Sequence, residues 1–417
     1  MAGEHVLVVN GGKVEPVELL RQDRGLRISM ITEPGHRHLY PDLEHVTTVD
    51  DIGDLKQVRT AALGVIAARG PVDAVVAPSE RSLPTGGYLR SYLGLPGLPF
   101  DTANLFCNKY AMKARLRAHG VPVAAGALAP TVAELPAAAR ATGLPVVVKP
   151  AFGNGTAFTH RVADAAELTG APLRASLDRA PGPFVVEEYL DVADEYHCDA
   201  LVVDGTVVFA SVSRYFQPVL RSLGALFGSH TVPEEAPEVP VVRSLNERTV
   251  AALGLRDGVT HLEVLRTTDS RFLVGEIACR PGGGGVPHVL ARKYGIDTRG
   301  LFLTSALGRP LDHEVRTADG VHYWCVLPVR HGTVAEVSTA DDFRDLPGVL
   351  HVEMAVAPGD TVAGTLYSTS MAGLIVGRTD RVDEIPGLLD RIRRRFTIRI
   401  EDGPVRPGRP TAGAARP

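Results

Sequence analysis

The sequence contains little cysteine. Cys107, Cys198, Cys279 and Cys325 are the four among 417 residues. They lack the close pairs of a zinc site, and their density is far below that of a disulfide-stapled domain. We therefore expect reduced, mostly buried thiols that behave as small apolar side chains.

Long apolar runs and an excess of basic residues are also missing. No run approaches the roughly 20 apolar residues that span a membrane, and the first ten residues resemble a strand rather than a signal peptide. The formal net charge is −4, whereas a nucleic-acid-binding domain usually carries a basic surface. These absences predict a cytoplasmic protein that binds neither a membrane nor nucleic acid.

Hydrophobic residues make up 45% of the chain, which is enough for two or three domain cores. Residues 1–103 alternate short apolar strands with helical segments, a pattern typical of a small parallel α/β unit. The stretch NGGKVEP after the first strand lacks the G-x-G-x-x-G spacing of a dinucleotide site. We expect this unit to be structural or to shape a substrate site.

The most informative stretch is residues 260–285, THLEVLRTTDSRFLVGEIACRPGGGG. It is typical of two alternating strands, 259–266 and 272–280, joined by a short polar turn. A four-residue turn predicts three cross-strand pairs: Thr267 with Phe272, Leu265 with Val274, and Glu263 with Glu276.

The pair of glutamates predicts a cation. Like charges directly opposed in a sheet are destabilising, so Glu263 opposite Glu276 makes sense mainly with a metal ion between them. The strand period of two also places Glu276, Ala278 and Arg280 on one face. A divalent metal beside an arginine predicts a phosphate site.

Two lysines lie on a predicted helix over residues 104–119. Lys109 and Lys113 are four positions apart, on the side away from Met112 and Leu116. Solvated helix lysines are the usual explanation for such a pair.

A third lysine, Lys149, ends a short apolar strand over 144–150. A glycine-rich stretch follows it, and such turns expose backbone N–H groups to anions, while a preceding lysine can neutralise phosphate. A plain hairpin turn explains the same residues equally well. The residues concerned are Gly153, Asn154, Gly155 and Thr156.

An acidic segment follows the apolar strand that begins at residue 184. Acidic residues at a strand end are usually a solvated rim. Here they could instead bind a nucleoside, with the backbone of residues 188–190 at a base edge and Glu195 accepting from ribose hydroxyls. The segment contains Glu187, Glu188, Tyr189 and Leu190.

The remaining segments are less specific. Residues 222–240 read as a long polar loop, and His230 within it is a candidate general base, although a loop histidine is more often a surface residue. Residues 311–402 predict a mixed α/β unit, and residues 403–417 are Pro/Gly/Ala-rich and predict a disordered tail.

The order of these features resembles the ATP-grasp superfamily. The shared order is a helix lysine, a strand-end lysine, a glycine-rich loop, an acidic strand end and the pattern E…E-x-A-x-R-P-G-G. The resemblance covers about residues 104–309 and is closest to carboxylate–amine ligases of the L-amino-acid (dipeptide) ligase type. It implies an α/β fold with a parallel pre-ATP-grasp domain at 1–103, a two-lobed α+β ATP-grasp domain at 104–310 and a C-terminal α/β domain at 311–402.

The resemblance also implies a role for each candidate residue. ATP phosphates would be bound by Lys109 and Lys149, beneath a loop of Gly153, Asn154, Gly155 and Thr156. Adenine would be held by Glu187 with the backbone of Glu188, Tyr189 and Leu190, and ribose by Glu195. Glu263 and Glu276 would bind Mg²⁺, or Mn²⁺ in its place, and Arg280 would bind the substrate carboxylate or its acyl phosphate.

The implied activity is an ATP-dependent, ADP-forming ligase. It would activate a small carboxylate such as an amino acid as an acyl phosphate and join it to an amine, and a homodimer is one expected assembly. The superfamily often has asparagine where this chain has Ala278, which predicts one firmly held Mg²⁺ or water in place of the missing ligand. A bicarbonate-using carboxylase and a non-catalytic ATP-binding regulator are the alternatives; Ala278 favours the regulator and Arg280 opposes it.

Overall fold

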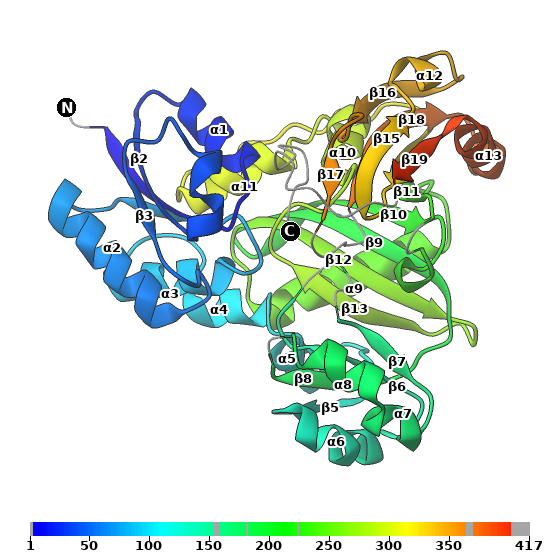
Figure 1. Cartoon of the computed structure of the whole chain (residues 1–417), viewed down its shortest axis with the longest axis horizontal. Helices are drawn as coiled ribbons and strands as arrows, with labels where there is room; N and C mark the ends of the chain where they lie inside the picture. Colours follow the sequence, from blue (N-terminus) through cyan, green and yellow to red (C-terminus); the bar gives the residue numbers. More distant parts are fainter. Residues whose placement is uncertain are drawn as a thin grey trace.

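The computed structural model describes residues 3–153, 155, 158–180, 182–222, 225–363 and 370–401. Within these ranges the strands form four sheets, the largest of which lies at the centre of the molecule (Figure 1). The predicted tail 403–417 and two predicted loop residues, Asn154 and Thr156, lie outside the described residues.

The N-terminal sheet is parallel, with the order β3-β2-β1-β4. Its strands β1 and β4 are nearly continuous buried runs, as expected of strands covered on both faces of a sheet. The strands are β1 (Glu4–Val9), β2 (Leu26–Thr32), β3 (Val46–Thr48) and β4 (Ala74–Val76), and the helices are α1 (Glu15–Gln22), α2 (Leu55–Arg69), α3 (Leu83–Leu93) and α4 (Phe100–Leu105).

A second four-stranded sheet lies at the bottom of Figure 1, in the order β5-β8-β6-β7. It is antiparallel throughout. Its elements are β5 (Gly126–Ala129), α6 (Leu135–Thr142), β6 (Val146–Pro150), β7 (His160–Val162), α7 (Ala165–Thr169), α8 (Ala171–Leu177) and β8 (Phe184–Glu188).

The central sheet is antiparallel and has eight strands, in the order β13-β12-β9-β10-β11-β14-β18-β16. The last three strands belong to the segment predicted as a C-terminal unit, so the sheet continues past residue 310. Its strands are β9 (Val192–Val203), β10 (Thr206–Tyr215), β11 (Phe227–Thr231), β12 (Gly258–Thr267), β13 (Phe272–Ala278), β14 (Val321–Pro328), β16 (Val349–Met354) and β18 (Met371–Thr379).

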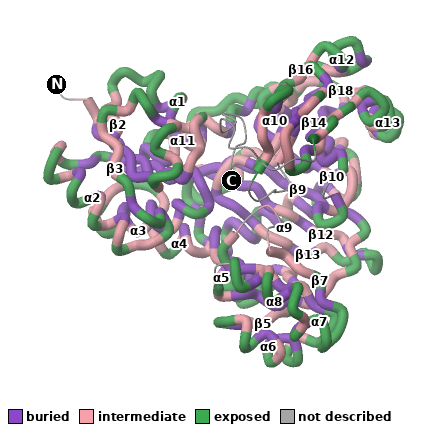
Figure 2. Tube along the Cα trace, viewed as in Figure 1, coloured by how far each residue is buried: buried purple, intermediate pink, exposed green. Residues whose placement is uncertain are grey.

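The two faces of the central sheet differ in chemistry. One face buries apolar side chains such as Tyr196, Cys198 and Leu262 against helices α5 (Lys109–Ala118) and α9 (Glu238–Leu253). Because successive side chains on a strand alternate in direction, Glu195 and His197 of β9 face the opposite way. That second face is partly covered by α10 (Val286–Tyr294); the burial is visible along the strands in Figure 2.

Two outer layers complete the fold. Helix α11 (Thr298–Ala306) contributes Leu303 and Ala306 to the core of the N-terminal sheet, although it follows the central hairpin in sequence. A three-stranded sheet, in the order β17-β15-β19, packs beside strands β14 and β18 of the central sheet. Its strands are β15 (Gly332–Val337), β17 (Thr361–Val362) and β19 (Ile398–Glu401), and the helices of this region are α12 (Asp341–Arg344) and α13 (Ile385–Arg395).

Two predictions of local structure were wrong. The predicted helix 104–119 is interrupted, because the Asn108 side chain accepts hydrogen bonds from the N–H groups of Tyr110 and Ala111, both at 3.1 Å, and so begins a new helix at Lys109. The predicted loop 222–240 contains a buried strand, β11. Its Gly228 hid that strand from sequence reasoning, yet a Cβ there would lie 2.0 Å from the Trp324 carbonyl oxygen, so only glycine fits.

Candidate active site

The hairpin of β12 and β13 places Glu263 opposite Glu276, as predicted. The register near the turn differs from the prediction by one residue, because Arg266 pairs with Phe272 and Leu265 with Leu273. A β-bulge beside Gly275 takes up the extra residue and restores the opposition of the two glutamates.

Three carboxylates gather on this face: Glu195, Glu263 and Glu276. Burial raises the pKa of Glu263, and the nearby charge of Glu276 raises it further. Burial, with Glu263 as the second cause, raises the pKa of Glu195 to about 8. Oxygen ligands that oppose one another's ionisation suit a hard divalent cation, so this set of donors fits Mg²⁺.

Lys109 connects these carboxylates to the glycine-rich loop. Its Nζ lies 2.7 Å from Glu276 Oε1 and also donates to the backbone oxygen of Gly153. A second carboxylate, Glu80, is 3.9 Å away. Burial opposes the charge of Lys109, but Glu276 and Glu80 outweigh it and raise the lysine pKa. Lys109 is therefore a buried cation at the carboxylate group rather than a solvated helix lysine.

Lys113 was also expected to be solvated, and it is buried instead. Its Nζ lies 2.7 Å from Glu187 Oε1, while Lys149 Nζ lies 3.0 Å from Glu187 Oε2. Burial opposes ionisation of Glu187, but the two lysines outweigh it and lower its pKa to about 2. Sequence reasoning missed Lys113 as a site residue, although it placed Lys113 on the same side of the helix as Lys109.

Arg280 is held by a residue that sequence reasoning missed altogether. Its Nη2 donates to Glu80 Oε2 at 2.7 Å, and its Nη1 donates to the Pro281 carbonyl at 3.1 Å. Glu80 follows β4, and the carboxyl ends of parallel strands are where α/β sheets commonly bind ligands. From the sequence alone, this position after a strand of a parallel sheet could have indicated Glu80 as a site residue.

Lys13 follows β1 at the same edge of the N-terminal sheet. Burial and the neighbouring charge of Arg280 lower its pKa to about 8, while Glu80 acts in the opposite direction. Together with Arg280 and Glu80 it forms a mixed-charge group between the N-terminal sheet and the β12–β13 hairpin.

Comparison with known proteins identifies the family. A model described as the L-amino acid ligase C-terminal domain 2 matches residues 324–401. The L-arginine-specific L-amino acid ligase of Bacillus subtilis is 31% identical over 407 residues, covering 95% of this chain and 98% of the relative. The chain belongs to the L-amino acid ligase family.

Solved structures share the fold of this ligase. The L-amino acid ligase of Bacillus licheniformis superposes with a TM-score of 0.74 at 20% identity, covering 96% of this chain and all of that structure. A carboxyaminoimidazole ribonucleotide synthase of Aspergillus clavatus, complexed with ATP, gives a TM-score of 0.69 at 16% identity over 94% of this chain and 99% of its own. These likenesses confirm the predicted ATP-grasp fold.

Family membership confirms the predicted activity: the protein is an ATP-dependent, ADP-forming ligase that makes amide bonds. It does not favour the carboxylase or the non-catalytic regulator. Within the described ranges, the helices are all too short or too polar to cross a bilayer.

The residues at the end of β8 and just after it have local partners in this ligase. Glu188 exchanges two hydrogen bonds with Ala125, through its N–H at 2.9 Å and through Oε1 at 2.8 Å. The Tyr189 N–H donates to Pro145, and the ring lies 4.6 Å from the Arg161 guanidinium. These bonds tie Glu188 and Tyr189 to the segments at Ala125 and Pro145, and Leu190 next to them is half-buried.

Three other candidates are placed by their strands. Glu195 Oε2 accepts a hydrogen bond from the Val219 N–H at 2.8 Å. Ala278 lies opposite His261 in the hairpin register. His230, expected at the surface, is buried on β11, and its ring stacks on that of Phe216 with the ring centroids 6.3 Å apart.

Two residues of the predicted glycine-rich loop, Gly153 and Gly155, are described, and both have a positive φ (150° and 61°).

Proposed function

We propose that this ligase activates the carboxyl group of one L-amino acid as an acyl phosphate and joins it to the amino group of a second, forming a dipeptide. The observation that carries the proposal is the opposition of Glu263 and Glu276, with Lys109 bound to Glu276 and Arg280 two positions beyond Ala278. This arrangement supports a site in which Glu263 and Glu276 would bind a metal, Lys109 would bind phosphate and Arg280 would bind a carboxylate.

Glu263 and Glu276 would hold Mg²⁺, or Mn²⁺ in its place. When bound, the metal would supply positive charge that neutralises the transferring phosphoryl group. Both glutamates are partly exposed, with side-chain exposures of 32% and 24%. That exposure supports a role as accessible ligands.

Lys109 and Lys149 would bind the phosphates, with Gly153, Asn154, Gly155 and Thr156 closing over them. Glu187 would orient Lys149 while Lys113 balances the charge of Glu187, as the distances of 3.0 and 2.7 Å suggest. A lysine held by a buried carboxylate keeps a fixed geometry, which favours positioning of a phosphoryl group. The nucleoside would lie along residues 187–190, with Glu195 at the ribose.

Arg280 would bind the carboxylate that is activated. Its planar fork suits both a carboxylate and an acyl phosphate. Glu80, bonded to Arg280 at 2.7 Å, would hold the arginine and could accept from the ammonium group of the same amino acid. The pairing of a cation with an anion matches the two charged ends of an amino acid.

The test is to supply ATP and Mg²⁺ with pairs of L-amino acids, and to measure ADP, phosphate and dipeptide together. L-Arginine is the first amino acid to include, because the 31% identical relative is named for that specificity. We expect ADP and dipeptide in equal amounts, only when both amino acids are present. AMP and pyrophosphate as products, or ADP release that depends on bicarbonate instead, would contradict the proposal. The elution volume of the purified protein tests the predicted homodimer.

A further inference from the structure

Lys13 is a cation of the candidate site whose ammonium group is left without a partner. The residue lies in the loop after β1 and is half-buried. Within the described ranges, all of its hydrogen bonds go through its backbone. The next carboxylate along the chain, Glu15, is bound to Arg299 instead, at 2.9 Å. The ammonium group is therefore free to bind an anion.

The sheet brings Lys13 to the same edge as Glu80. Strands β1 and β4 are parallel neighbours, and each of the two residues lies four positions after the end of its strand. The charges of Arg280 and Glu80 both act on Lys13, with opposite effects on its pKa. Because ligands of α/β sheets commonly bind at the carboxyl ends of the strands, all three side chains lie where a substrate is expected.

The loop after β1 holds the backbone of Lys13 in place. Gly12 has a φ of 98°, which favours glycine at this turn. The side chain of Asn10 accepts from the Lys13 N–H at 3.1 Å and donates to the Lys13 carbonyl at 2.5 Å, and Tyr40 Oη donates to the same carbonyl at 3.1 Å. Asn10 and Tyr40 are both buried. A long, flexible side chain thus starts from a fixed point.

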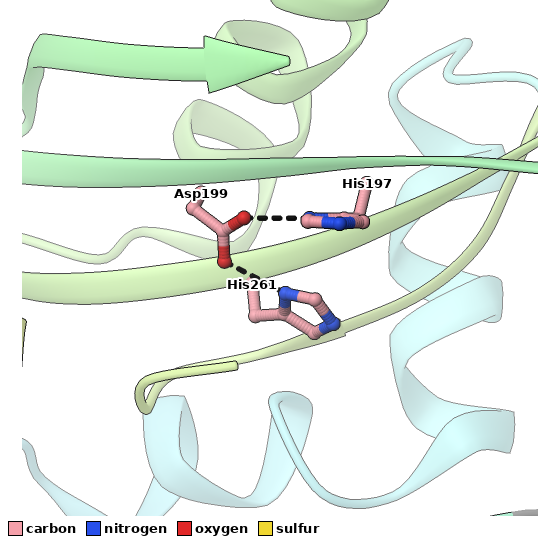
Figure 3. A group of neighbouring side chains, drawn as sticks. All are labelled: His197, Asp199 and His261. Atoms are coloured by element: carbon pink, nitrogen blue, oxygen red, sulfur yellow. Dashed lines mark hydrogen bonds and ion pairs between the residues drawn. The ribbon is translucent and has the colours of Figure 1, made fainter. Parts of the chain in front are cut away.

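The other cations of the site already have carboxylate partners. Each of them lies within 3.0 Å of a carboxylate oxygen: Lys109 of Glu276, Lys113 and Lys149 of Glu187, and Arg280 of Glu80. Two buried histidines of the central sheet are bonded to a carboxylate as well, with His197 Nδ1 2.6 Å and His261 Nδ1 2.8 Å from Asp199 (Figure 3). Among these described side chains, Lys13 is the cation without a counter-charge.

The proposed reaction requires one more cation than the donor amino acid uses. Arg280 and Glu80 match the carboxylate and the ammonium group of the amino acid that is activated. The second amino acid attacks through its amine, so its own carboxylate stays ionised throughout. A carboxylate taken out of water is costly unless a cation or hydrogen-bond donors receive it. Lys13 is the side chain available for that purpose.

We propose that Lys13 binds the α-carboxylate of the amino acid that supplies the amine. The inference rests on the proposed function, because a second carboxylate enters the site only if the acceptor is an amino acid. Lys13 is a substrate-binding residue in this role and exchanges no proton with the reacting groups. It makes the ligase prefer acceptors with a free carboxylate over amines that lack one.

The experiment compares an amino acid with its own amide as the acceptor. The amide has an amine but no carboxylate to activate, so it can act only as acceptor. Donor and acceptor come from the pair that forms the most dipeptide with ATP and Mg²⁺, and mass spectrometry identifies the order of residues in the product. The variants are Lys13→Met and Lys13→Arg. Lys56→Met is the matched control, because Lys56 is an exposed lysine on α2 of the same unit.

We expect Lys13→Met to raise KM for the free acceptor acid at least about tenfold, with KM for the amide, the donor and ATP changed by less than about twofold. Lys13→Arg keeps the charge and should restore part of the loss, and Lys56→Met should match wild type. Burial and the charge of Arg280 disfavour the charged form of Lys13, as its lowered pKa indicates. Lys13→Met should therefore not lower the melting temperature. If it does not fold, Lys13→Gln provides the same comparison.

The outcomes separate this inference from the proposed function. A wild-type protein that forms no dipeptide from any pair would refute the proposed function, and this inference with it. Dipeptide formation with an unchanged preference for acid over amide in Lys13→Met would overturn the inference alone. Equal losses with acid and amide would also overturn it, because they would assign Lys13 to the acyl phosphate that both reactions share.

Discussion

Glu80 and Arg280 are 200 positions apart in the sequence, and Glu80 Oε2 accepts a hydrogen bond from Arg280 Nη2 at 2.7 Å. The bond joins the carboxyl edge of the N-terminal parallel sheet to the segment just after β13, the strand that carries the proposed metal ligand Glu276. Both side chains are well buried, with exposures of 5% and 18%. The N-terminal sheet therefore contributes a residue, Glu80, to the candidate site.

Replacing Glu80 by glutamine should impair the use of the amino acid more than the use of ATP. Gln keeps the shape but loses the charge that holds Arg280, so the arginine no longer stays aligned for a carboxylate. We expect KM for the activated amino acid to rise at least tenfold, with KM for ATP changed much less. Steady-state kinetics at varied amino acid and at varied ATP provide the check. An equal rise in both KM values would indicate a general structural role.

Glu276→Gln should abolish ADP formation while the protein stays folded. The change removes a proposed metal ligand and also the carboxylate that Lys109 contacts at 2.7 Å. Glu80, 3.9 Å from the same lysine, remains as a counter-charge, so Lys109 is not left as an isolated buried cation. ADP release and circular dichroism measured side by side test the prediction. Turnover within tenfold of wild type would contradict it.

Glu187→Gln should be strongly destabilising. It leaves Lys113 and Lys149 buried without their shared counter-charge, and breaking a buried ion pair in this way costs about 3–5 kcal/mol. Urea denaturation near pH 7 measures the loss. Glu188→Gln is the matched control, because its amide oxygen can still accept the Ala125 N–H, and we expect less than about 1 kcal/mol there.

The same carboxylate sets an acid limit on stability. The pKa of Glu187 is about 2 in the folded protein against 4.5 as its ordinary value. A lowered acid pKa gives stability that is complete above the unfolded value and is lost as the pH falls through the folded one. We therefore expect the free energy of unfolding to fall between pH 4.5 and 2 in wild type, with a smaller slope in Glu187→Gln.

His230 should add a separate loss of stability at milder pH. Burial lowers its pKa from 6.5 to about 4, so the unfolded chain takes up a proton before the folded one does. Stability should then fall as the pH drops from 6.5 to 4, by up to about 3 kcal/mol from this residue. Denaturation curves at half-unit pH intervals should show a shallower slope in His230→Gln. An unchanged slope would mean that the buried ring is not the group responsible.

The β12–β13 hairpin shows which features of the candidate site could be predicted from the sequence alone. Strict alternation would place Glu276 on the same face as Val274. In the structure Val274 packs in the core with Ile277 and Cys279, a spacing of three and then two that only the bulge at Gly275 permits. The opposition of the glutamates was predicted correctly, but through a register that was wrong by one residue at the turn. A bulge depends on packing from both faces, so alternation alone cannot locate it.

The lysines and Glu80 show a different limit. A helix seen alone gives no reason to bury Lys113, because the counter-charge Glu187 comes from a strand more than seventy residues later. Glu80 could not be found for the same reason, since its partner Arg280 follows β13, 200 positions later in the sequence. The order of motifs identified the superfamily and the proposed ligands, whereas the supporting charges arise only when distant segments meet. The roles assigned to individual residues, and the division into domains, remain predictions.

Strands from before and after residue 310 share the central sheet, and this limits where segments of two such ligases can be exchanged. Trp324 on β14 stands directly against the glycines that follow Arg280: a Cβ on Gly285 would come within 2.3 Å of the Trp324 Cβ. Ending the chain before β14 would remove that support and leave β11 as an open edge, which invites pairing with other chains. A chimaera made to exchange substrate preference should therefore inherit β11, the glycine stretch and β14 from one parent, with its crossover placed upstream of residue 227.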